Sequence, residues 1–122
     1  MAKRILLIED SQTTVALLKE RIEAANYEVL AAYNGEDGLK QMKDLKPDLV
    51  LLDVRMPGID GFEVCRIAKD DPEIKSIPII FVTTAAQEVD VEKGKKLLAE
   101  GYITKPYEGK ELVKEIRRVL KE

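Results

Sequence analysis

Polar residues follow several short apolar runs in this chain of 122 residues. Glu9 and Asp10 come directly after the run Ile5–Ile8, and Asp53 comes directly after Leu49–Leu52. An apolar run of this length predicts a buried strand, and burial of an unpaired carboxylate is costly. Asp53 therefore needs neighbours that compensate its charge. Other polar residues follow two later runs: Thr83, Thr84 and Lys105.

Three carboxylates that meet at one place repel one another, so each resists ionisation unless a positive charge lies nearby. Lys105 is one source of that charge, and a divalent cation is a second. Mg²⁺ binds carboxylate, carbonyl and water oxygens and often phosphate oxygens as well, which fits Glu9, Asp10 and Asp53. The chain has no histidine and one cysteine, which argues against a site for a softer metal.

A carboxylate beside Mg²⁺, a hydroxyl group and a lysine is suited to phosphoryl transfer. In such a site the carboxylate attacks phosphorus and forms an acyl phosphate. The cation and Lys105 would neutralise charge on the phosphoryl oxygens, which supplies most of the catalysis that this transfer needs. Thr83 would donate a hydrogen bond to the new phosphoryl group.

Alternating strands and helices are predicted to position these residues. The strands are expected at Arg4–Ile8, Glu28–Ala32, Leu49–Leu52, Ile79–Val82 and Gly101–Thr104. The helices are expected at 11–25 (capped by Ser11), Glu36–Leu45, Gly61–Asp70, Val89–Leu98 and Glu108–Leu120. Strict alternation predicts one α/β domain over residues 1–122, a doubly wound parallel sheet with helices on both faces, (βα)5. Ligands bind such folds beyond the carboxyl ends of the strands, near the point where the strand order reverses.

Composition excludes several classes of protein. The net charge of −3 gives no general attraction to nucleic acid or to anionic membranes. A single cysteine excludes an internal disulfide and favours a reducing cytoplasm. No segment approaches the ~18 consecutive apolar residues that span a bilayer. We therefore expect a cytoplasmic domain that contacts neither nucleic acid nor a membrane directly.

The remaining residues predict ordinary packing or solvated surface. Cys65 is expected to be a small apolar filler without chemistry of its own. Leu39, Met42 and Leu45 are expected to face the core from one helix. A group of charged residues is expected to form a solvated helix face: Glu92, Lys93, Lys95, Lys96 and Glu100.

The order of the polar motifs resembles that of the receiver domains of two-component response regulators, and the similarity covers essentially the whole chain. The residues that carry it are Glu9-Asp10, Asp53 with Met56-Pro57-Gly58 and Asp60-Gly61, Thr83, and Tyr102-Ile103-Thr104-Lys105-Pro106. The resemblance implies a flavodoxin-like fold and a signalling switch rather than an enzyme with a separate substrate. It also implies a phosphodonor partner, either a sensor histidine kinase or a histidine phosphotransfer protein.

The same resemblance implies roles for the acidic residues. Asp53 would be the phosphoacceptor. Asp10 and Asp53 would bind Mg²⁺ directly, and Glu9 would bind it through water. The backbone carbonyl of Arg55 would complete the protein ligands.

The resemblance also implies a switch. Lys105 would pair with the phosphoryl group, and the Lys105–Pro106 bond is expected to be cis. Thr83 would move toward the phosphate, and the ring of Tyr102 would swing inward behind it. The face formed by the fourth helix, fifth strand and fifth helix would then repack and contact a downstream effector. At the position of Leu98 the family often has glycine.

The leading expectation is a stand-alone receiver that acts by protein contact or passes its phosphate to another histidine. Three alternatives remain to be compared with it. The chain could be a receiver cut from a longer response regulator or hybrid kinase. An aspartyl-nucleophile phosphohydrolase usually needs a second acid two residues after the nucleophile, where this chain has Arg55. A flavodoxin-like nucleotide binder needs glycines and amides after the first strand, where this chain has Glu9-Asp10-Ser11-Gln12.

Overall fold

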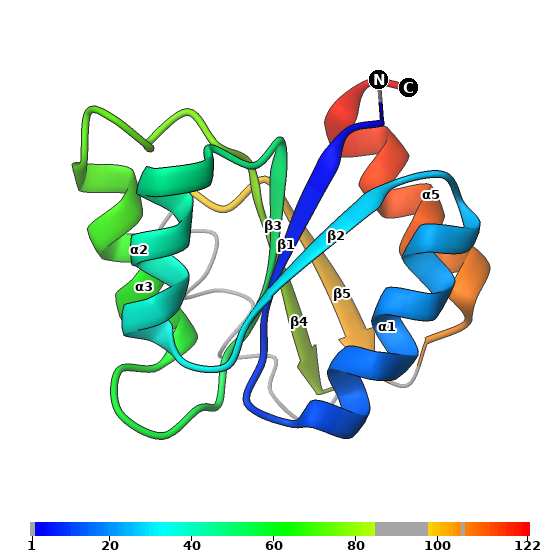
Figure 1. Cartoon of the computed structure of the whole chain (residues 1–122), viewed down its shortest axis with the longest axis horizontal. Helices are drawn as coiled ribbons and strands as arrows, with labels where there is room; N and C mark the ends of the chain where they lie inside the picture. The colour runs from blue at the N-terminus through cyan, green and yellow to red at the C-terminus, as the bar shows by residue number, and fades with distance from the viewer. Residues whose placement is uncertain (1, 85–97, 106) are drawn as a thin grey trace.

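The computed structural model describes residues 2–84, 98–105 and 107–122, which form one five-stranded parallel sheet with helices on both faces (Figure 1). The strands are β1 (Arg4–Ile8), β2 (Glu28–Ala32), β3 (Leu49–Asp53), β4 (Ile79–Thr84) and β5 (Gly101–Lys105). The helices are α1 (Gln12–Ala24), α2 (Gly35–Leu45), α3 (Gly61–Asp70) and α5 (Gly109–Leu120). The predicted doubly wound α/β fold is confirmed. Residues 89–97 of the predicted fourth helix lie outside the described residues.

Two apolar cores lie on opposite faces of the sheet. In Figure 1, α2 and α3 cover one face, while α1 and α5 cover the other. Successive residues of a strand point to opposite faces, so β1 sends Leu6 and Ile8 into the first core and Ile5 and Leu7 into the second. The buried strands β1 and β3 are apolar on both faces for this reason. No helix in the described ranges has both the length and the apolar character that a bilayer crossing requires.

Three helices begin just after the carboxyl ends of strands, and each has a polar N-cap. The side chains of Ser11, Asn34 and Asp60 each accept a hydrogen bond from the backbone N–H three residues later, at 3.2, 2.7 and 2.9 Å. Such caps satisfy amide groups that the first helical turn leaves without partners. The cap predicted at Ser11 is confirmed, and all three caps stabilise loops at one edge of the sheet.

The strand order β2-β1-β3-β4-β5 reverses direction between β1 and β3. These two strands pair in parallel, with Ile8 opposite Leu52. The next residues along the chain are Glu9, just after β1, and Asp53, the last residue of β3. Glu9 is held there by its N–H, which donates to the carbonyl of Ala32 at 3.0 Å. The predicted polar residues therefore lie at the reversal point, where ligands bind in such sheets.

Two leucines have unusual environments: Leu45 is exposed, and Leu98 has a left-handed backbone conformation. Leu45 was predicted to face the core, but it is 37% exposed. It is the last residue of α2, and Lys46 ends the helix by taking a left-handed φ of 47°. No further helical turn therefore covers Leu45. Leu98 also has a left-handed φ, 66°, a conformation that favours glycine.

A close approach between α3 and β3 makes Gly61 important for stability. A Cβ atom at Gly61 would lie 2.2 Å from the carbonyl oxygen of Asp53 and 2.9 Å from the Cα of Val54. These are backbone atoms, so they cannot move aside without displacing the end of β3. We expect Gly61→Ala to lower the free energy of unfolding by about 1–3 kcal/mol, as overpacking does, in urea denaturation.

Gly109→Ala is the matched control. Gly109 begins α5, and the nearest atom that its Cβ would meet is Nη1 of Arg21, at 3.4 Å. Alanine is favoured over glycine in a helix, so this variant should be at least as stable as the wild type. A Gly61→Ala protein that unfolds at the wild-type urea concentration would contradict the packing argument.

Candidate functional site

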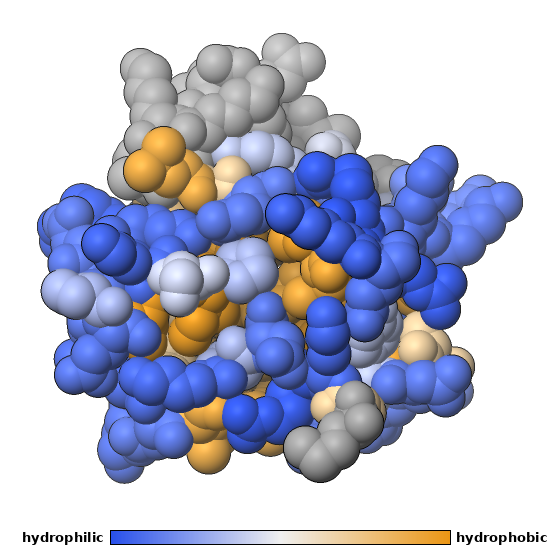
Figure 2. Space-filling view, turned by 90° about the horizontal axis from the view of Figure 1, so that it is seen from above, coloured by the Kyte–Doolittle hydropathy of each residue, from blue (hydrophilic) through white to orange (hydrophobic). Residues whose placement is uncertain are grey.

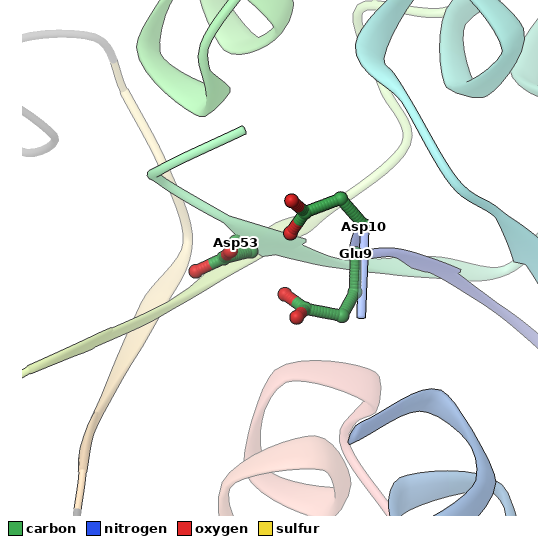
Figure 3. Close-up of side chains that lie close together, drawn as sticks. All are labelled: Glu9, Asp10 and Asp53. Atoms are coloured by element: carbon green, nitrogen blue, oxygen red, sulfur yellow. The ribbon is translucent and has the colours of Figure 1, made fainter. Parts of the chain in front are cut away.

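Three carboxylates converge at the carboxyl ends of β1 and β3. Glu9, Asp10 and Asp53 each contribute an oxygen atom, and these atoms all lie within 4.8 Å of one another. Figure 3 shows the side chains of Glu9 and Asp10 extending from the end of β1 toward Asp53. The sequence predicted this grouping, and the parallel pairing of β1 with β3 explains it. Oxygen donors gathered in this way are suited to a hard cation.

Glu9 is the most perturbed group of the site. It is only 7% exposed, and its carboxylate accepts a hydrogen bond from the N–H of Ser11 at 3.2 Å. Burial, together with the hydrogen bond and negative charge of Asp53, raises the pKa of Glu9 to about 7, although Ser11 and Lys105 act in the opposite direction. Without a cation, Glu9 thus retains a proton at pH values where a carboxyl group in water has lost it.

Lys105 places a positive charge beside Asp53. It is the last residue of β5, and its Nζ atom lies 4.0 Å from Oδ1 of Asp53. This distance permits an ion pair but exceeds that of a hydrogen bond. Asp53 is 15% exposed, so its charge is only partly screened by water. An oxygen atom of a ligand bound to Asp53 would therefore lie close to the positively charged Nζ of Lys105.

The two predicted switch residues lie on adjacent strands. The backbone of Thr83 lies in β4 and pairs with Thr104 of β5, but its side chain lies outside the described residues. Tyr102 lies in β5, and its ring stacks on that of Phe81 with centroids 6.1 Å apart. Phe81 in turn contacts Phe62, at 5.4 Å. The ring of Tyr102 thus packs against the core between the sheet, α2 and α3.

Two further predicted features of the site are the carbonyl of Arg55 and the Lys105–Pro106 bond. Arg55 lies in the loop after β3, and its side chain is exposed. The role of its carbonyl as a metal ligand stays a prediction. Pro106 lies outside the described residues, and so does the predicted cis bond that precedes it.

The prediction for Glu100 is confirmed for its exposure but wrong for its secondary structure, because Glu100 is exposed and does not lie in a helix. Glu100 was expected on a solvated helix face, but it lies just before β5, and its carboxylate accepts a hydrogen bond from Nζ of Lys69 at 2.9 Å. Its other oxygen accepts from the N–H of Ile79 at 2.8 Å. Lys69 and Glu100 are 31 residues apart, so no local sequence pattern indicates their contact.

A family model describing the response regulator receiver domain matches residues 5–117 of the chain. The chain belongs to this family. The receiver domain is 43% identical to protein PilH of Pseudomonas aeruginosa, over 96% of this chain and 97% of PilH. It is 34% identical to the polar-differentiation response regulator DivK of Brucella anthropi, over 98% of each chain.

Solved structures agree with this assignment. The signal receiver domain of a signal transduction histidine kinase from Syntrophus aciditrophicus is 33% identical to the receiver domain described here. Its TM-score is 0.91, and the alignment covers 98% of this chain and 91% of that one. The predicted membership of the receiver family is confirmed.

The raised pKa of Glu9 predicts a pH-dependent stability. The folded state binds the Glu9 proton more tightly than the unfolded state, so the free energy of unfolding falls as the pH rises from 4.5 to about 7. Glu9→Gln has no such proton to lose. In EDTA at about pH 8 this variant should be more stable than the wild type by up to about 3 kcal/mol.

Urea denaturation of both proteins checks this expectation. At about pH 5 the two proteins should be similarly stable, because glutamine resembles the protonated carboxyl group. Comparing the two proteins cancels the titration of other carboxyl groups. An equal difference in stability at both pH values would show that Glu9 titrates normally.

Proposed function

We propose that this receiver domain is a phosphorylation-activated switch in which Asp53 accepts a phosphoryl group from a phosphohistidine. The donor would be a sensor histidine kinase or a histidine phosphotransfer protein. The observation that carries the proposal is the convergence of Glu9, Asp10 and Asp53, with Lys105 at 4.0 Å from Asp53. This set of groups occurs in a chain of the response regulator receiver family, whose relatives PilH and DivK are similar over nearly their whole length.

The donor set fits Mg²⁺. Every candidate ligand is a hard oxygen, and burial beside the negative charge of Asp53 raises the pKa of Glu9. In our proposal Asp10 and Asp53 bind the ion directly, Glu9 binds it through water, and the carbonyl of Arg55 is a further ligand. When bound, Mg²⁺ would neutralise charge on the phosphoryl oxygens.

Asp53 supplies the nucleophile. One carboxylate oxygen forms a bond to phosphorus while the bond between phosphorus and the donor histidine nitrogen breaks, and the electron pair of that bond leaves with the imidazole. The modified side chain carries a charge of about −2 at neutral pH. Nζ of Lys105 pairs with a phosphoryl oxygen, and the Thr83 hydroxyl donates a hydrogen bond to another.

The same charge drives the conformational change. Shifting a population from 1:99 to 99:1 requires about 5.5 kcal/mol, and a hydrogen bond to a charged group contributes about 1.5–3 kcal/mol. A few new bonds from Thr83 and Lys105 therefore suffice. The Tyr102 ring already packs on Phe81, so phosphorylation would raise the population of a position that the chain can reach without phosphate.

The proposed output surface comprises the fourth helix, β5 and α5. Tyr102 and Lys105 both belong to β5. In our proposal, a shift of either residue therefore displaces neighbouring residues of this strand. A downstream effector protein would bind the repacked surface, or the phosphate would pass to a second histidine.

Phosphorylation with a small donor tests the proposal. With acetyl phosphate and Mg²⁺, the intact mass should rise by one phosphoryl group, and Asp53→Asn or added EDTA should abolish the increase. Asp70→Asn is the matched control, because Asp70 is exposed on α3 and its ion pair with Arg66 is a distant one, at 3.8 Å. Labelling that persists in Asp53→Asn would reject Asp53 as the phosphoacceptor.

A further inference from the structure

A group of charged residues lies at the amino-terminal end of β5, away from the carboxylates. The group consists of Lys69, Glu100, Glu115 and Arg118, and we call it the β5 clamp. Figure 2 views the molecule from this end, and the surface seen there is largely hydrophilic. The clamp joins α3, the start of β5 and α5. None of its members belongs to the proposed phosphorylation site.

One half of the clamp holds the residue just before β5. Lys69 is only 10% exposed, and its Nζ donates to both carboxylate oxygens of Glu100 at 3.0 and 2.9 Å. Glu100 also pairs with β4, because its N–H donates to the carbonyl of Ile79 at 2.9 Å while its carboxylate accepts from the Ile79 N–H. Glu100 is therefore bound through both its backbone and its side chain.

The other half of the clamp reaches β5 from α5. Arg118 forms two parallel hydrogen bonds with Glu115, from Nε at 2.7 Å and from Nη2 at 2.9 Å. Nη2 also donates to the carbonyl of Glu100 at 3.0 Å. Glu115 accepts a hydrogen bond from the backbone N–H of Tyr102 at 3.2 Å. Arg118, together with this N–H, holds the pKa of Glu115 below its ordinary value.

Gly101 makes this approach possible. A Cβ atom at Gly101 would lie 2.6 Å from Oε2 of Glu115 and 3.2 Å from Nη2 of Arg118. A side chain would therefore push the charged pair away from the strand. Gly101 thus leaves space for the side chains of Glu115 and Arg118. These side chains bind the backbone of its two neighbours, Glu100 and Tyr102.

We propose that Glu115 and Arg118 are positioning residues for the switch, which hold the backbone of Tyr102 so that its ring stays on Phe81 before phosphorylation. The ring planes are 22° apart, and this near-parallel stacking depends on where the Cα atom of Tyr102 lies. The inference rests on the proposed role of Tyr102. It adds that the inward conformation is favoured in advance by contacts made at the far end of the same strand.

The clamp then affects the phosphorylation site by linkage. If the phosphoryl group binds best when the ring is inward, its apparent affinity falls in proportion to the fraction of molecules in that conformation. Loosening the clamp lowers this fraction. The affinity of the carboxylates for Mg²⁺ alone should stay unchanged, because neither Glu115 nor Arg118 contacts them.

Beryllofluoride, a stable mimic of the phosphoryl group, allows the measurement. Its dissociation constant in saturating Mg²⁺ is determined by calorimetry for the wild type and for variants at position 115. Glu115→Ala should raise this constant by roughly three- to tenfold, the effect of one lost hydrogen bond. Glu115→Gln keeps an acceptor for the Tyr102 N–H, so its effect should be smaller. Glu111→Ala is the control, because it removes the same charge from an exposed position of α5.

A double-mutant cycle separates positioning from general loosening. In a Tyr102→Ala background, Glu115→Ala should no longer change the dissociation constant, because the ring on which the clamp acts is absent. Equal constants for Glu115→Ala and Glu111→Ala would overturn the inference, as would an undiminished effect in the Tyr102→Ala background. A wild type that fails to bind beryllofluoride would overturn the proposed function as well, so the two failures are distinguishable.

Discussion

Repulsion among Glu9, Asp10 and Asp53 is the constraint on which the rest of this receiver domain depends. Parallel pairing of β1 with β3 brings two strand ends together, and their polar residues with them. Burial makes that proximity costly, and it raises the pKa of Glu9 to about 7. The fold thus maintains a site in which the positive charge of Lys105 does not offset three carboxyl groups. The proposed binding of a cation follows from this deficit, and a bound cation would in turn offset the charge of a phosphoryl group.

The strand β5 connects this site to the surface of α5. At its carboxyl end, Lys105 lies 4.0 Å from Asp53. At its amino-terminal end, the β5 clamp holds Glu100 and the N–H of Tyr102. The ring of Tyr102 packs on Phe81 of β4 between these two ends. In our proposal, a charge change at Asp53 and a contact on α5 therefore both affect the position of this ring.

Local pattern predicted most of the architecture and failed where residues distant in sequence meet. The strands were predicted to within a residue or two, because each is an apolar run bounded by turn residues. Ser11 was correctly predicted as an N-cap from its position before an amphipathic segment. Leu45 satisfied the helical period but lies where α2 ends, and Glu100 is exposed as predicted but lies just before β5 and pairs with Lys69 of α3.

The sequence by itself determined the alternation of strands and helices and the set of oxygen donors after β1 and β3. It did so because hydrophobic period and turn residues are local properties, and alternation leads to a parallel sheet with its carboxyl ends at one edge. Only the tertiary structure decided that Nζ of Lys105 lies 4.0 Å from Asp53, that Glu9 is buried enough to retain a proton, and that Gly101 leaves room for Glu115. These properties depend on strand order and side-chain packing, which arise from contacts between distant residues that no local pattern records.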